Sequence, residues 1–259
     1  MATSKQYIKN VTTLFFLFCG LIFVADLLAA SSDNPVPLPA PSGTIINVST
    51  VEELQEAVNN IQSNTAIVIA PGNYRLTNTL FFNGGGGVTN VSIRGETTNR
   101  GDVIIEGLGM SNANYGNVPH GIMVENIDGI TIANLTIKDI YFHPITFNIG
   151  TQAPHIFNVR LLDAGEQFVK ANPDGSGGGV NDGIVEYSVF EYSTTAKSYY
   201  TNAVDVHTGR NWAIRHNLFK NIRAPQGELA GPAVLMWNNT QNSIVEGNTF
   251  IECQRGISL

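Results

Sequence analysis

The sequence predicts an all-β solenoid, a stack of coils made of short strands, closed at its N-terminal end by one α-helix. Three observations carry this prediction. The 259 residues include 26 Gly and 28 Asn, which favour turns, whereas charged residues make up 14% and hydrophobic residues 43%, enough for a core. One strand-like segment recurs along the chain. A single stretch shows helical periodicity, which excludes a helical solenoid.

The first 30 residues have the pattern of an export signal. Two lysines precede an apolar run over residues 11–28, and small residues suited to cleavage follow it. We therefore expect a signal peptide over residues 1–30 and a secreted, periplasmic or cell-surface protein, with an uncleaved membrane anchor as the alternative. The Pro-rich residues 31–43 predict an extended linker before a domain over 44–259, and we expect further coils beyond that domain's last strand.

Charge and cysteine content exclude several classes of protein. The formal net charge is −7, and signal cleavage removes two lysines and one aspartate to leave −8, which argues against nucleic-acid binding. Cys253 is then the only cysteine, so no internal disulfide is expected. Gly84–Gly87 precedes a predicted strand and not a helix, so no nucleotide site is expected. We expect a monomer.

The first predicted element is an α-helix over residues 48–61. Ser49 or Thr50 can cap it, and two glutamates lie in its first turn. A buried strand over 66–70 follows and ends at Pro71. We expect the helix to cover the first coil, because it has one apolar face. The residues of that face are Val51, Leu54, Val58 and Ile61.

The chain after this strand repeats one pattern, in which a large apolar residue stands near the middle of each copy. The matched residues are Ile137, Leu161, Phe190, Phe219 and Phe250. Their spacings of 24, 29, 29 and 31 residues, with Gly, Asn and Asp between the copies, are typical of a solenoid of strands. Asn217 and Asn248 occupy matched turns, where we expect a structural ladder of side chains.

The copies at Asn217–Phe219 and Asn248–Phe250 resemble the right-handed parallel β-helix of the pectin-lyase-like superfamily, over residues 44–259. Many chemistries share that fold, so the resemblance implies the architecture more strongly than an activity. The commonest chemistry in the superfamily is β-elimination in acidic polysaccharides. Gly247–Phe250 is also similar to coils of chondroitinase-B-type and alginate lyases, although residues 233–238 lack the acidic metal ligands and the lysine base that those enzymes carry there.

A second strand in each coil is predicted to carry the working surface. Alternation turns apolar residues inward, among them Val169 and Ala171, and turns Lys170 outward, since burying it without a partner would be costly. Stacking of the strands then predicts an outward column. Its members are Glu125, Asn148, Lys170, His207 and Trp237. Thr146 and Asp205 are expected beside it.

The resemblance to lyases assigns roles on this face. Lys170 would remove the C5 proton, with His207 as the alternate base, and Arg210 or Ca²⁺ would neutralise the uronate carboxylate. The carboxylates that would hold Ca²⁺ are Glu125, Asp205 and Asp182. The residues that would contact the sugar are Trp237, Asn148, Asn172 and Tyr199.

Three insertions, over residues 172–182, 194–201 and 223–231, enter or leave this same face. The first is expected to be a flexible lip or a Ca²⁺ loop. Three functions stay open: a secreted polysaccharide lyase or C5 epimerase, a non-catalytic carbohydrate-binding or surface protein, and a structural solenoid without a ligand. The acidic mature charge repels polyanionic glycans at long range, which favours the second function or a Ca²⁺-bridged first.

Overall fold

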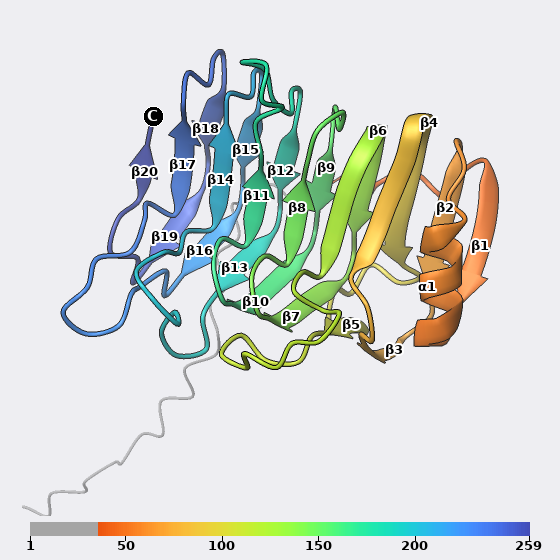
Figure 1. Cartoon of the computed structure of the whole chain (residues 1–259), viewed down its shortest axis with the longest axis horizontal. Helices are drawn as coiled ribbons and strands as arrows, with labels where there is room; N and C mark the ends of the chain where they lie inside the picture. Colours follow the sequence, from red (N-terminus) through yellow and green to blue (C-terminus); the bar gives the residue numbers. More distant parts are fainter. Residues whose placement is uncertain (1–35) are drawn as a thin grey trace, which may run out of the picture.

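The computed structural model describes residues 36–259, which form a stack of coils made of parallel strands (Figure 1). The strands belong to one 13-stranded and one 7-stranded sheet. They line three faces that run along the stack, because the long strands β4 (Leu80–Gly95) and β6 (Ile122–Ala133) pass from the first face to the second. This arrangement confirms the predicted parallel β-helix.

The strand bounds follow the order of the coils. The first face continues with β8 (Ile145–Phe147), β11 (Val169–Ala171), β14 (Val204–His207), β17 (Val234–Trp237) and β20 (Ile257–Ser258). The second face holds β1 (Thr44–Val48), β2 (Thr65–Ile69), β9 (His155–Phe157), β12 (Ile184–Glu186), β15 (Ala213–Arg215) and β18 (Ile244–Glu246). The third face holds β3 (Gly72–Arg75), β5 (Val103–Glu106), β7 (Thr136–Ile140), β10 (Arg160–Ala164), β13 (Val189–Glu191), β16 (Leu218–Lys220) and β19 (Thr249–Ile251).

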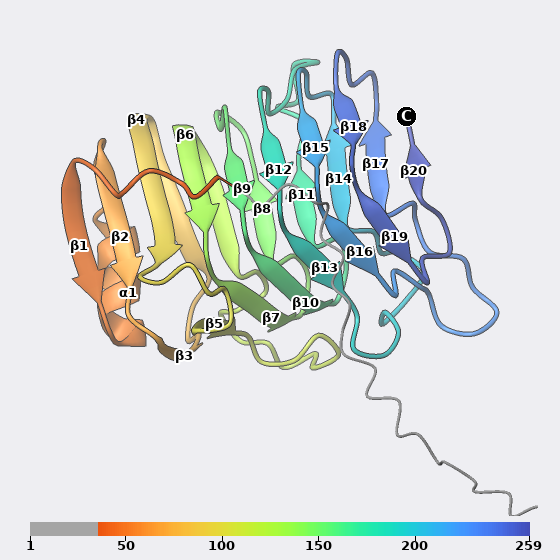
Figure 2. The ribbon, with the colours of Figure 1, turned by 180° about the vertical axis from the view of Figure 1, so that it is seen from behind.

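One helix, α1 (Val51–Asn59), covers the N-terminal end of the stack, as predicted (Figure 2). Thr50 caps it through a capping box: the Glu53 N–H donates to Thr50 Oγ1 at 3.1 Å, and the Glu53 carboxylate accepts from the Thr50 N–H. Leu54 and Val58 are fully buried against the first coils. The helix is shorter than the predicted 48–61 because β1 runs up to Val48.

The core is a set of apolar columns that follow the strand register. Ile137, Leu161, Phe190, Phe219 and Phe250 pair in that order along the third face, which confirms the predicted alignment. The rings of Phe190 and Phe219 stack at 5.0 Å between centroids, as do those of Phe219 and Phe250. On the first face Val169 and Ala171 point inward and are fully buried, also as predicted.

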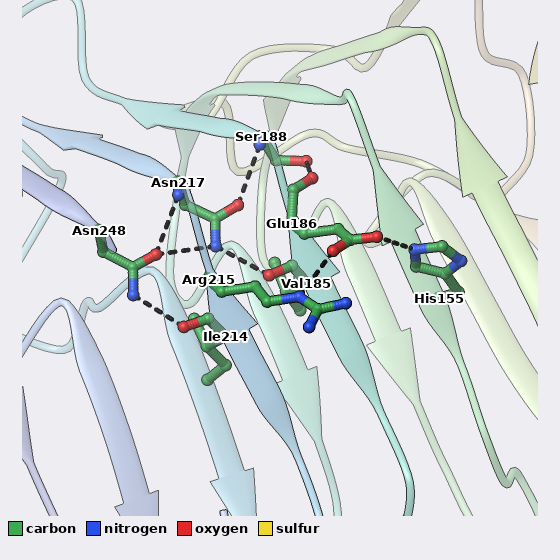
Figure 3. A network of polar contacts seen from close by, with 8 residues as sticks. All are labelled: His155, Val185, Glu186, Ser188, Ile214, Arg215, Asn217 and Asn248. Atoms are coloured by element: carbon green, nitrogen blue, oxygen red, sulfur yellow. Dashed lines mark hydrogen bonds and ion pairs between the residues drawn. The ribbon is translucent and has the colours of Figure 1, made fainter. Parts of the chain in front are cut away.

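A polar ladder stabilises the turns between the second and third faces (Figure 3). The Asn217 amide accepts from the Ser188 N–H at 2.9 Å, and Asn248 Oδ1 accepts from both the backbone N–H and the side chain of Asn217. This confirms the structural ladder predicted for the two asparagines. On the adjoining strands Glu186 bridges His155 and Arg215, at 3.0 and 2.8 Å. These groups satisfy one another and belong to the scaffold.

The predicted signal peptide and residues 31–35 of the predicted linker lie outside the described residues. Residues 36–42 have no regular secondary structure, and β1 begins at Thr44. No helix formed by residues 36–259 combines the length and the apolar character needed to cross a bilayer.

Candidate functional site

The register of the first face separates the predicted column into two. Lys170 pairs with Thr146 on one side and with Asp205 on the other, whereas His207 pairs with Trp237. The prediction that Lys170 stands in line with His207 is therefore wrong, because His207 lies two residues further along its strand. A shift of two residues keeps the same alternation of inward and outward side chains, so the hydrophobic pattern does not distinguish the two registers.

Lys170, Asp205, His207 and Asn238 nevertheless meet, and we call them the Lys170 cluster. The Lys170 ammonium donates to Asp205 Oδ2, and its Nζ lies 2.9 Å from His207 Nε2. His207 Nε2 is 3.1 Å from Asp205 Oδ1, and His207 Nδ1 is 3.1 Å from Asn238 Nδ2. The side chains of Lys170, Asp205 and His207 are 9%, 3% and 18% exposed. His207 is thus the most accessible of the three.

The tautomer of His207 decides which contacts are hydrogen bonds. Lys170 donates to Nε2 only when the imidazole proton is on Nδ1, whereas Asn238 donates to Nδ1 only when that proton is on Nε2. In the second tautomer the Nε2 proton faces Asp205, and Nδ1 is left as a proton acceptor. The tautomer of His207 therefore determines whether its Nε2 accepts from Lys170 or donates to Asp205.

Electrostatics keep Asp205 ionised. Burial raises the pKa of its carboxyl, but His207 and the charge of Lys170 outweigh burial and hold this pKa below its usual value. His143, on the preceding coil, shows the opposite balance, since burial lowers the pKa of its imidazole to about 3. His143 is thus neutral at ordinary pH; its Nδ1 lies 3.1 Å from the Gln167 carbonyl oxygen, and its ring stacks on His120.

Two of the predicted sugar-contacting residues, Asn148 and Asn172, form a ladder of side-chain hydrogen bonds with Glu125. Asn172 Nδ2 donates to Asn148 Oδ1 at 2.8 Å, and Asn148 Nδ2 donates to Glu125 Oε1 at 3.0 Å. Both asparagines line a pocket of about 350 Å³. Asp174 and Ser176, from the loop after β11, line it as well, so this loop forms one side of the pocket as a lip would.

The predicted calcium ligands do not come together. Glu125 accepts from Asn148, Asp205 is paired with Lys170, and Asp182 accepts from Asn211. In the loop after β11, the Asp174 carboxylate accepts hydrogen bonds from two backbone N–H groups of that loop. Over residues 36–259 no group of three or more His, Cys, Asp or Glu side chains is placed to hold a metal ion.

A second pocket of about 350 Å³ opens over β14 and β17, and we call it the Trp237 pocket. Exposed apolar side chains line it, at 60% for Tyr199, 52% for Tyr200, 56% for Leu229 and 51% for Trp237. Asp205 lines it as well and so connects it to the Lys170 cluster. Exposed aromatic rings beside polar groups are the usual means of binding sugar rings.

The loop before β14 positions the tyrosines of this pocket. Lys197 Nζ lies 3.6 Å from the centre of the Tyr141 ring and donates to the Tyr141 carbonyl oxygen at 3.1 Å. The loops before β14 and β17 project from the same edge of the coils (Figure 1). They supply Tyr199 and Leu229 to the pocket and correspond to the insertions predicted over residues 194–201 and 223–231.

Sequence reasoning missed several residues of the site. Gln167, Asn202 and Arg255 line the Trp237 pocket, and each stands two residues before a pairing position on the first face. That shared offset is a signal that the sequence does contain. Arg210, the predicted neutraliser, is exposed beyond the end of β14 and does not line this pocket, whereas Arg255 does.

Comparisons with known proteins give structural likenesses only. No protein-family model matches the chain, and no curated protein sequence matches it. A GH87 α-1,3-glucanase catalytic domain in complex with nigerose matches at 14% identity and a TM-score of 0.41, covering 84% of this chain and 47% of that one. The PL6 alginate lyase AlyGC matches at 12% identity and a TM-score of 0.35, covering 85% of this chain and 42% of that one. An alginate lyase from Paenibacillus sp. str. FPU-7 matches at 14% identity and a TM-score of 0.35, over 82% of this chain and 99% of that one.

This chain therefore spans less than half of the first two of these structures, 47% and 42%. The parallel β-helix follows from the strand register itself. Likenesses at this level give no information about activity.

Proposed function

We propose that the protein is an exported, polysaccharide-active β-helix protein that cleaves a uronate-containing glycan by β-elimination on its first face. One observation carries this proposal: the Trp237 pocket joins exposed aromatic walls to the ionised Asp205 of a cluster that also holds a histidine and a lysine. The walls suit sugar rings, and the cluster suits proton transfer. Solved structures with these coils include alginate and pectate lyases, which is in keeping with the proposal but does not carry it.

The geometry favours His207 over Lys170 as the base. Loss of a proton from Lys170 would leave the buried Asp205 carboxylate without its cation. In the tautomer with its proton on Nε2, His207 takes the substrate's C5 proton at Nδ1, once the Asn238 amide that donates to Nδ1 has turned away. Asp205 Oδ1, 3.1 Å from Nε2, then stabilises the imidazolium.

The electrons of the broken C5–H bond form the C4–C5 double bond as the C4–O4 bond breaks. The departing oxygen takes a proton from water, and His207 returns its proton to solvent. The products are an unsaturated uronate and a shortened glycan. No oxidant, reductant or cofactor is consumed.

Ultraviolet absorbance of the new C4–C5 double bond tests this function directly. We would incubate the longest folded form of the chain with a panel of polyuronates and of uronate-containing heteroglycans, first with Ca²⁺ and then with a chelator. Signal is expected for the wild type and a loss of at least 100-fold, typical of a removed general base, for His207→Gln. The matched control is His155→Gln on the second face, whose side chain is 21% exposed and ion-paired; it is expected to keep full activity.

A non-catalytic glycan-binding protein is the second candidate, and one observation favours it. Lys170 and Asp205 already neutralise each other, so the cluster can bind a glycan without a charged group of the substrate to balance it. Glycan binding without any unsaturated product would support this candidate over the lyase. An unsaturated product that forms equally well in His207→Gln would instead reassign the base.

A further inference from the structure

The floor of the Trp237 pocket is lined by acceptor atoms that lack donors. Gln167 Oε1 and Asn202 Oδ1 are buried and make no hydrogen bond within residues 36–259, whereas the buried Asp205 Oδ1 lies 3.1 Å from His207 Nε2. Their residues are only 2%, 3% and 2% exposed. Buried polar atoms without partners are rare in folded proteins because each carries an uncompensated desolvation cost. Two such acceptors beside the buried Asp205 carboxylate on one pocket indicate that a ligand supplies the missing donors.

The positions of these residues show that the floor is built by the coil repeat. Gln167 and Asn202 each stand two residues before the paired positions Val169 and Val204. Asp205 follows Val204 and points outward from β14, next to Lys170 in the register. Adjacent parallel strands lie about 4.8 Å apart. The acceptors thus lie on neighbouring coils, at a spacing that hydroxyl groups of one sugar ring can span.

The chemistry of the floor selects against a carboxylate. A uronate carboxylate has only acceptor oxygens, so it cannot supply the donors that Gln167 Oε1 and Asn202 Oδ1 lack, and the ionised Asp205 repels it. Sugar hydroxyls donate, and an Asp205 oxygen can accept from one while it faces His207. Arg255 is exposed and lines the same pocket, and its Nε donates to the Ala230 carbonyl oxygen at 2.7 Å. Its remaining N–H groups are available to an anion outside the floor.

We propose that the Trp237 pocket binds one uncharged sugar unit through Gln167, Asn202 and Asp205, and that Arg255 binds the carboxylate of the adjoining unit. The substrate class is then an acidic heteroglycan in which neutral sugars alternate with uronates, and not a homopolyuronate. This inference rests on the proposed function, since it specifies the ligand of the same site. The pocket volume of about 350 Å³ lies at the small end of ligand sites, in keeping with a single unit.

Gln167→Met tests the floor, because methionine keeps the length of the side chain and removes its polar end. Removing an unpaired buried acceptor is expected to leave the melting temperature unchanged or to raise it. The same variant is expected to bind the glycan about tenfold more weakly, the loss of one hydrogen bond to the ligand. If Gln167 had a purely structural role, its replacement by methionine would instead lower the melting temperature. The control is Gln62→Met beside the capping helix, where Gln62 is exposed.

The probes are hexasaccharides of galacturonate, mannuronate and guluronate, each compared with a form in which half of the carboxylates are reduced to hydroxymethyl groups. Calorimetry on the wild type is expected to show at least tenfold tighter binding of a half-reduced form than of its parent. Full reduction is expected to weaken binding again, because it removes the carboxylate that Arg255 would bind. Arg255→Gln is expected to abolish this difference in affinity between the half-reduced and the fully reduced form. The matched control Arg210→Gln is expected to retain it.

The outcomes separate this inference from the proposed lyase activity. Tight binding of a half-reduced glycan that depends on Gln167, without an unsaturated product, supports the inference and rejects the lyase. Cleavage of an unreduced homopolyuronate at full rate in Gln167→Met supports the lyase and overturns the inference. Destabilisation by Gln167→Met, equal binding of parent and half-reduced forms, or no binding to any probe also overturns it.

Discussion

Replacement of Lys170 by methionine is expected to destabilise the protein far more than the loss of an ordinary lysine. The side chains of Lys170 and Asp205 are 9% and 3% exposed, and Lys170 donates directly to Asp205. Lys170→Met leaves a buried carboxylate that keeps only His207 as a polar neighbour. Breaking a buried ion pair in this way costs about 3–5 kcal/mol in the free energy of unfolding.

Urea unfolding at pH 7 measures this cost, with the slope m checked for constancy. The double variant Lys170→Met/Asp205→Leu is expected to regain most of the loss, because it removes the stranded charge as well. The matched control is Lys220→Met, whose ion pair with Glu191 spans 3.8 Å and whose side chain is 42% exposed. That variant is expected to cost less than about 1 kcal/mol.

The pH dependence gives a second measure of the same pair. The folded-state pKa of Asp205 lies below its unfolded value, so its contribution is fully present above the unfolded pKa and is lost as the pH falls through the folded pKa. The wild type is therefore expected to lose stability below about pH 4, the ordinary pKa of a free carboxyl, and the double variant to lose less there. A loss below 1 kcal/mol at pH 7 for Lys170→Met, or a double variant no better than the single one, would refute the reasoning.

Three further predictions concern the core, a buried histidine and a loop. Phe219→Ala removes a fully buried ring stacked between two others and is expected to cost about 3–5 kcal/mol by urea unfolding, against under 1.5 kcal/mol for Phe219→Leu if that side chain repacks. His143 has a pKa of about 3 through burial, so stability is expected to fall by about 1.4 kcal/mol per pH unit between pH 6.5 and 3, and less steeply in His143→Gln. An identical slope in that variant would contradict the assignment. Lys197→Met removes the contacts with the Tyr141 ring and carbonyl oxygen that attach the loop carrying Tyr199 to the preceding coil, and it is expected to weaken glycan binding several-fold by calorimetry at a nearly unchanged melting temperature.

The coil architecture was predictable because it rests on side chains that must be buried. Phe190 and Phe219 could be aligned from their spacing, since each coil needs one large apolar residue at the same place on the third face. Val169 and Ala171 could be turned inward because the opposite choice would bury Lys170 without a partner. In each case the alternative arrangement would carry a large free-energy cost, so the sequence pattern determines which side chains point inward.

The site was less predictable because its geometry depends on features that leave the burial pattern unchanged. A register shift of two residues separates Lys170 from the column of His207 yet keeps every apolar residue inside. Lys170 contacts His207 diagonally across neighbouring strands, and the alternation of inward and outward residues alone does not indicate such a contact. Gln167 and Asn202 lie before their strands, in segments without a period, so only the shared offset across coils marks them.

The first face uses its polar residues in two opposite ways, and hydrogen-bond complementarity explains the difference. Asn172, Asn148 and Glu125 form a chain in which each amide donor meets an acceptor on the next coil, so these groups need no ligand. Such a ladder holds its coils in register and adds stability. Gln167 and Asn202 occupy an equally regular position, but their buried oxygens remain without donors.

A repeat fold can continue a satisfied ladder from coil to coil at little cost, whereas an unsatisfied one lowers stability unless a ligand completes it. Gln167 and Asn202 line the same pocket as Tyr199 and Leu229, which come from the two loops before β14 and β17. Burial of these acceptors strengthens each hydrogen bond that a bound sugar makes to them. The repeat therefore places the acceptors, and the loops that depart from it mark the coils that carry the function that we propose.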